Sequence, residues 1–241
     1  MNASASKITS ACFNAQQDGF AVATESGIRF FNTHPLVLLR SFSREQVGGV
    51  KIVSILHRSN IIVFVGGGSY AKFPSNTVMV WDDKQQELVL EVTVTGGPIL
   101  NVLLTYSKLI VLQDRRIHVF QFPNPCKLIR SEEIRFNPTG LAAIGCDFNG
   151  ASQMLAYPGF KAVGPFERRE AKFSAKFLLN GVFFACGFLK GTSSTMQSIV
   201  AICQDGSYHR FSFGADGTAK REGFDYVMQL ADEQEFWTKP F

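Results

Sequence analysis

Short apolar strands recur along this chain at intervals of about 40 to 50 residues, and this repeat limits the possible folds more than any other feature. Strands of one kind read ITSACFN at 8–14, VKIVSIL at 50–56, ILNVLLT at 99–105 and GLAAIGC at 140–146. Strands of a second kind, such as NTVMVWDD and RRIHVFQF, recur at a similar spacing, each of them after a strand of the first kind. This spacing is typical of β-propeller blades, in which each repeat forms one small four-stranded sheet.

The strands of the second kind each close a hairpin, with turn residues between its arms. Glu25–Gly27, Gln113–Arg115 and Asp205-Gly206 are such turns. Phenylalanine and β-branched residues fill the short apolar runs, whereas long helical periodicity is absent. We therefore predict an all-β fold, a WD-repeat-type β-propeller.

The triple glycine Gly66–Gly68 invites comparison with a phosphate-binding loop. A nucleotide site of that kind needs a helix after the glycines, whose N-terminus faces the phosphates. Here the glycines are followed by loop residues and then by the alternating strand around Val78–Trp81. The sequence thus favours the end of a strand followed by a long hairpin loop.

The repeat is interrupted in the second half of the chain. RRIHVFQF ends at Phe122 and its next counterpart, GSYHRFSF, ends at Phe213, about twice the expected period later. We expect a single domain over residues 1–241 with about five blade fragments and an irregular junction near 160–178. The propeller is therefore predicted to be incomplete.

Composition excludes several classes of protein. A net charge of +4 with scattered basic residues demands no nucleic-acid partner. The five cysteines are far apart and odd in number, as expected for reduced thiols, and the N-terminus lacks a signal-peptide pattern. These features predict a cytoplasmic protein, and because no segment of about 18 apolar residues is present, contact with any membrane is expected to be peripheral. We also expect a monomer.

No motif for catalysis, metal binding or cofactor binding stands out, so we expect a protein that is not an enzyme and has no cofactor. The histidines His34, His57, His118 and His209 have no carboxylate or cysteine at ligand spacing. The adjacent carboxylates Asp82 and Asp83 follow a strand, where a solvent-facing turn is expected rather than an acid/base pair.

An ordered series of motifs, HRSNIIVFVGGG, VMVWDD, FNPTGLAAI, LAYPG and SIVAICQDGSYHRFSF, resembles the PROPPIN family of seven-bladed propellers. The resemblance covers roughly residues 8–160 and 180–236. It implies an autophagy scaffold that is recruited to autophagosome precursor membranes by phosphatidylinositol 3-phosphate or the 3,5-bisphosphate. It also implies that the scaffold recruits a lipid-transfer protein or conjugation machinery.

The resemblance implies that headgroups bind through blades five and six, at a Phe/Leu-Arg-Arg-Gly signature that this chain lacks. Arg168 and Arg169 are the nearest substitute, but Glu167 and Glu170 flank them and the glycine is absent. Five basic residues against two acidic ones give 161–176 a charge of +3, which provides about 3 kcal/mol of unselective attraction to an anionic surface. Lipid binding by this pair and a solvated charged loop remain alternatives.

The early blades, where the resemblance places protein partners, are intact. Asn14 matches the family's Phe-Asn-Gln-Asp start, whereas Asp18 is displaced, because Ala15 is inserted before Gln16 and Gln17. The alternative for both residues is a turn held by side-chain hydrogen bonds. Two functions therefore stay open: a PROPPIN-like scaffold, and an adaptor or shortened isoform that has lost membrane recognition.

Overall fold

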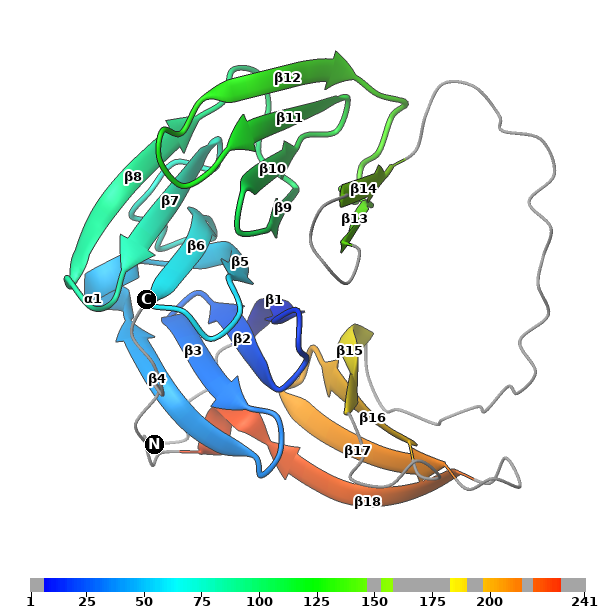
Figure 1. The fold of residues 1–241 in the computed structure, drawn as a ribbon. Helices are drawn as coiled ribbons and strands as arrows, with labels where there is room; N and C mark the ends of the chain where they lie inside the picture. The colour runs from blue at the N-terminus through cyan, green and yellow to red at the C-terminus, as the bar shows by residue number, and fades with distance from the viewer. Residues whose placement is uncertain (1–6, 147–152, 158–182, 190–196, 214–218, 231–241) are drawn as a thin grey trace, which may run out of the picture.

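The structure is a computed structural model that describes residues 7–146, 153–157, 183–189, 197–213 and 219–230. Within these ranges nearly all regular structure is β-strand, so the all-β prediction is confirmed. Figure 1 shows the sheets following one another around an arc, with β1, β5, β9, β13 and β15 on its inner side.

Three complete sheets come first, each an antiparallel meander in chain order. The first contains β1 (Ile8–Phe13), β2 (Gly19–Thr24), β3 (Gly27–Asn32) and β4 (Val37–Ser43). After the short helix α1 (Arg44–Val47), the second contains β5 (Val50–Ile55), β6 (Ile61–Gly66), β7 (Thr77–Asp82) and β8 (Glu87–Thr93). The third contains β9 (Asn101–Leu104), β10 (Lys108–Leu112), β11 (Arg116–Gln121) and β12 (Leu128–Glu133).

A fourth and a fifth sheet complete the described part of the chain. The fourth is the hairpin of β13 (Ala143–Cys146) and β14 (Gln153–Ala156). The fifth contains β15 (Phe183–Leu189), β16 (Gln197–Cys203), β17 (Ser207–Phe213) and β18 (Ala219–Tyr226), and the short helix η1 (Val227–Gln229) follows it. The prediction of about five blade fragments is confirmed, whereas the junction near 160–178 lies outside the described residues.

Each complete sheet is buried on both faces because alternate residues of its middle strands serve two different interfaces. In β2, Phe20 and Val22 join the core cluster shared with the fifth sheet, while Ala21 and Ala23 join the cluster shared with the second sheet. The middle strands β6 and β10 divide their residues in the same way. This division explains why these strands are continuous apolar runs in the sequence.

The last sheet packs directly against the first. The hydroxyl of Tyr208 in β17 donates to the carbonyl oxygen of Thr33 at 2.7 Å, and its ring stacks near Phe20 with centroids 6.3 Å apart. Arg29 of β3 donates to the carbonyl oxygens of Met228 and Leu230, at 3.0 and 3.3 Å. Residues 228–230, which follow β18, are thus held on the first sheet, as in a propeller whose last blade adjoins its first.

Side chains also join neighbouring sheets at their inner strands. The hydroxyl of Thr9 donates to the carbonyl oxygen of Val50 at 2.6 Å, and the backbone amide of Val53 donates to the Ser10 hydroxyl at 3.2 Å. A cavity of about 330 Å³ lies among β1, β5 and β9, with Ile144 of β13 beside them. Apolar side chains share its lining with Ser10, Ser54, His57 and Asn101, and no carboxylate or ammonium group of the described residues lines it.

Gly66 ends β6, as the sequence predicts, and the loop of residues 67–76 leads to β7. A Cβ at Gly66 would lie 2.1 Å from the carbonyl oxygen of Phe73, so only glycine fits this close approach. Gly68 has a φ of +81°, which also favours glycine. The triple glycine therefore serves the packing of a hairpin loop.

Candidate protein-interaction surface

The turn between β1 and β2 brings the two predicted partner-binding residues together. The side-chain amide of Asn14 donates to the Asp18 carboxylate at 2.7 Å and accepts from the backbone amide of Gly19 at 3.2 Å. Gln17 adopts a φ of +59° and donates its backbone amide to the carbonyl oxygen of Asn14. Asn14 is only 2 % exposed, so its direct role is to shape the turn, as the structural alternative predicts.

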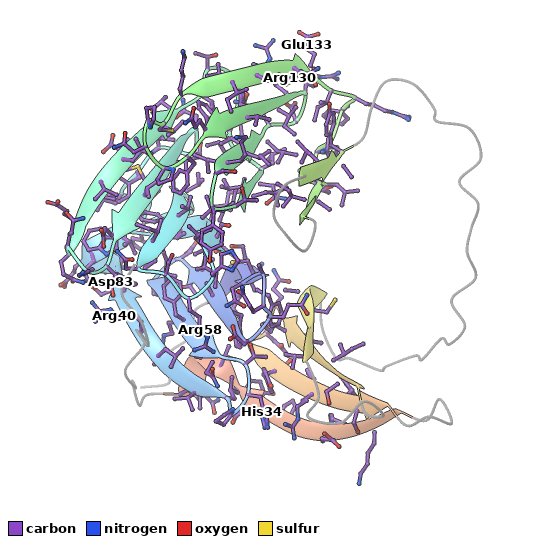
Figure 2. All side chains as sticks on the ribbon, viewed as in Figure 1. His34, Arg40, Arg58, Asp83, Arg130 and Glu133 are labelled. Atoms are coloured by element: carbon purple, nitrogen blue, oxygen red, sulfur yellow. The ribbon has the colours of Figure 1, made fainter. Side chains whose placement is uncertain are left out.

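Asp18 is exposed and reaches across to the second sheet. Its carboxylate accepts from Nε of Arg58 at 3.0 Å, and its backbone oxygen accepts from Nη2 of the same residue at 2.8 Å. Arg58 also donates to the side chain of Asn32. An exposed ion pair adds at most about 1 kcal/mol, but several hydrogen bonds together fix the position of the guanidinium. Figure 2 shows Arg58 where the first and second sheets meet.

An aromatic stack continues this surface onto the third sheet. The ring of His57 stacks on Tyr106, with centroids 4.1 Å apart and planes 11° apart, and its Nδ1 lies 2.8 Å from Oε1 of Gln16. Burial lowers the pKa of His57, and the carboxylate of Asp18 opposes this shift. Tyr106 is 53 % exposed. Because each of these residues follows an inner strand, the turns lie on the same face of the arc.

The resulting interaction surface consists of Gln16, Asp18, His57, Arg58 and Tyr106. It combines a fixed guanidinium and a partly exposed tyrosine ring, two residue types that are enriched at protein interfaces, with a carboxylate that holds the guanidinium in place. These side chains position hydrogen bonds and an apolar contact but include no nucleophile with a base beside it. The arrangement is suited to binding a protein segment.

The expectation for Asp82 and Asp83 is wrong in one respect, because their turn is buried. They are 6 % and 5 % exposed. Asp82 accepts hydrogen bonds from Asn60, from the backbone of Lys84 and from Gln85. Burial alone would raise the pKa of Asp82, but these hydrogen bonds outweigh it and lower the pKa.

Asp83 pairs with Arg40 of the first sheet at 3.2 Å, and Figure 2 labels both residues. The same carboxylate accepts hydrogen bonds from Trp81 at 3.4 Å and from Gln86 at 2.7 Å, so the guanidinium and two neutral donors stabilise this second buried carboxylate. The two acids are structural, and the turn assignment itself holds.

The three histidines outside the interaction surface each lie within hydrogen-bonding distance of a neighbouring side chain. His118 and His209 are buried and hydrogen-bond to Gln113 and Ser207. His34 lies 2.8 Å from the guanidinium of Arg210. In the described part of the chain, no three histidine, cysteine or acidic side chains gather in a metal-binding arrangement.

Two sequence-based expectations concern lipid and membranes. Arg168 and Arg169 lie outside the described residues, so their role stays a prediction. Of the residues that the structure describes, none form a helix long and apolar enough to cross a bilayer.

Sequence reasoning missed Arg58, His57 and Tyr106. The signal was the repeat itself: residues 14–18, 57–60 and 105–107 are equivalent turns of consecutive sheets. Equivalent turns of neighbouring blades lie side by side, so aligning them would have placed these residues next to Asp18.

A scan against known protein-family models finds no match. Among curated proteins, SVP1-like protein 2 of Pichia angusta is 35% identical over 162 residues, which cover 66% of this chain and 43% of the relative. Ectopic P granules protein 6 of Caenorhabditis elegans is 34% identical over 146 residues, covering 59% of this chain and 37% of the relative. The chain therefore spans less than half the length of these relatives.

Solved structures of Hsv2 share the fold. KlHsv2 with loop 6CD replaced by a Gly-Ser linker aligns with a TM-score of 0.62 at 15% identity, covering 92% of this chain and 99% of that one. Kluyveromyces lactis Hsv2 aligns with a TM-score of 0.53 at 20% identity, covering 90% of this chain and 63% of that one. At this identity the likeness establishes the fold alone.

Proposed function

Because this chain is related to the PROPPIN family of β-propellers, we propose that it is an autophagy scaffold that binds a protein partner through the interaction surface of its first three blades. The family is one of non-enzymatic propellers, which supports a binding role over a catalytic one. The partner class implied by the family is the lipid-transfer protein of autophagosome formation, and the site of action is the precursor membrane.

The observation that carries this proposal is the continuity of the surface across complete blades. The Arg58–Asp18 ion pair joins the first blade to the second, and the His57–Tyr106 ring stack joins the second blade to the third. The apolar clusters beneath these turns are closely packed, with Val63, Val65 and Leu109 all fully buried. A partner would therefore meet a surface that is already organised, which reduces the entropy lost on binding.

A second candidate function is an adaptor that binds the same partner without recognising phosphoinositides. The absence of the Phe/Leu-Arg-Arg-Gly signature from this sequence favours it. Flotation of the chain with vesicles, with and without phosphatidylinositol 3-phosphate, separates the two functions. Equal flotation in both samples supports the adaptor, and a gain with the phosphoinositide supports the lipid-binding scaffold.

Partner binding is tested by a pull-down of the autophagic lipid-transfer protein with the full chain. We expect Arg58→Glu and Tyr106→Ala each to weaken capture at least tenfold, because residues of these types near the centre of an interface contribute about 2 kcal/mol or more. Tyr226→Ala is the control, since Tyr226 is a 38 % exposed tyrosine of the distant strand β18. Capture that survives both surface substitutions would refute the proposed surface.

A further inference from the structure

The connection from β12 to β13 presents two large apolar side chains to solvent. Phe136 is 53 % exposed, and Leu141 at 67 % is the most exposed large apolar side chain of the described residues. Single exposed apolar residues are common, but two of this size on one short connection call for a functional explanation. We refer to Phe136 and Leu141, with the neighbouring Arg115 and Arg135, as the blade-3 patch.

The loop that carries these side chains is held firmly by its own hydrogen bonds. Asn137 is 3 % exposed, and its side chain both donates to the carbonyl oxygen of Leu141 at 2.9 Å and accepts from the Leu141 amide at 2.8 Å. Its backbone amide donates to the carbonyl oxygen of Asp114 at 2.7 Å, and Asn101 donates to the carbonyl oxygen of Gly140 at 2.9 Å. The apolar side chains therefore project from a fixed support.

Two arginines without an ion-pair partner among the described residues lie beside this loop. The guanidinium of Arg115 lies over the ring of Phe136, 4.9 Å from its centroid, and Arg135 is exposed beside it. Arg116 pairs with Glu133 at 3.2 Å, whereas no ion pair between described residues involves Arg115 or Arg135. Three arginines against Asp114 and Glu133 leave an excess of one positive charge at the patch.

We propose that the blade-3 patch binds an anionic lipid surface, with Phe136 and Leu141 entering the interfacial region and the two unpaired arginines facing acidic headgroups. Aromatic and aliphatic side chains flanked by basic residues are the combination that holds proteins at such an interface. The proposal goes beyond the scaffold function, because it requires neither the partner surface nor a phosphoinositide signature.

The topology places the patch opposite the interaction surface. In each meander the turn after the first strand and the connection after the fourth lie at opposite ends of the strands, so Tyr106 and Phe136 belong to opposite faces. One face is then free to hold a partner while the other contacts the membrane.

The test is co-sedimentation of the full chain with phosphatidylcholine vesicles that either contain or lack phosphatidylserine. We expect binding only with phosphatidylserine, with no further requirement for a phosphoinositide. Phe136→Ser with Leu141→Ser should weaken binding at least tenfold, because two apolar side chains lose their burial. Arg115→Gln with Arg135→Gln should weaken it about 25-fold, roughly fivefold for each arginine.

Ile129→Ser is the matched control, because Ile129 on the outer strand β12 is also 53 % exposed but lies outside the patch. It should leave vesicle binding unchanged, and unchanged melting curves would show that all variants fold. Equal binding by wild type and the Phe136/Leu141 variant, no binding to phosphatidylserine vesicles, or strict dependence on a phosphoinositide would each overturn the proposal. Loss of partner capture by that variant, with vesicle binding intact, would instead identify a protein-docking patch.

Failure of this proposal is distinguishable from failure of the proposed function. The scaffold proposal is tested by the effect of Arg58→Glu and Tyr106→Ala on capture of the partner in the pull-down, and neither residue belongs to the blade-3 patch. Vesicle binding by those two variants should equal that of the wild type.

Discussion

Replacing Tyr208 with phenylalanine removes one hydroxyl group from the junction between the last and first sheets. Tyr208 is 4 % exposed, and Thr33, whose carbonyl oxygen accepts its hydrogen bond at 2.7 Å, is fully buried. The substitution keeps the packing against Phe20 but deprives a buried carbonyl group of this donor. We therefore expect Tyr208→Phe to lower the free energy of unfolding by about 1–3 kcal/mol.

The same junction should depend on pH. Burial raises the pKa of Tyr208 to about 12, against about 10 in an unfolded chain, and the positive charge of Arg210 opposes the shift. Because the folded pKa is the higher one, this stabilisation is fully present below pH ~10 and disappears as the pH rises to ~12. Its full size is about 3 kcal/mol, of which about 1.4 kcal/mol is lost by pH ~11.

Urea unfolding of the wild type, Tyr208→Phe and Tyr226→Phe at pH 8 and 11 measures both effects. Other groups also titrate in this range, so the informative quantity is the difference between wild type and variant at each pH. We expect the difference for Tyr208→Phe to shrink by about 1.4 kcal/mol between the two values, and that for Tyr226→Phe to stay near zero. A difference that is absent at pH 8, or independent of pH, would refute this view of the junction.

Two further substitutions test the packing of the second sheet. Gly66→Ala should cost about 1–3 kcal/mol of stability, because the added Cβ would lie 2.1 Å from the Phe73 carbonyl oxygen. Gly97→Ala is the control: a Cβ there would meet nothing within 4 Å, so stability should change by less than about 0.5 kcal/mol. Equal melting temperatures of the two variants would contradict this prediction. Asp82→Ala should cost about 2 kcal/mol at neutral pH, because Asn60 and the Lys84 amide lose an acceptor. Since the pKa of Asp82 is lowered in the folded state, its contribution to the free energy of unfolding is present above pH ~4 and lost below it. The stability of the variant should therefore fall less steeply than that of the wild type as the pH is lowered. An equally steep fall in both proteins would count against a stabilising role of the Asp82 carboxylate.

The sheets were predictable because their physical cause is local. Residues of β2 and β6 alternate between two apolar interfaces, so each strand is recognisable as an apolar run, and the repeat of such runs indicates blades. Gly66 likewise revealed its role through the loop residues that follow it. The packing of the last sheet on the first was less accessible, because the Tyr208–Thr33 hydrogen bond joins residues 175 positions apart.

The site was only partly predictable for a related reason. Asn14 and Asp18 form a local turn, which the residue types indicate, but the partner of Asp18 is Arg58, 40 positions away. The burial of Asp82 and Asp83 also depends on remote groups, since Arg40 of the first sheet pairs with Asp83. A strand-ending Asp-Asp pair therefore looks the same in the sequence whether its turn faces solvent or a neighbouring blade.

Amide hydrogen exchange tests most directly whether the first and last sheets pack side by side as propeller blades. The middle strands β16 and β17 should exchange as slowly as β2 and β3, because both pairs line one apolar cluster that includes the fully buried Phe20 and Ile202. Exchange in β16 and β17 that is orders of magnitude faster than in β2 and β3 would contradict the account, since it would mean that the last sheet opens independently of the first.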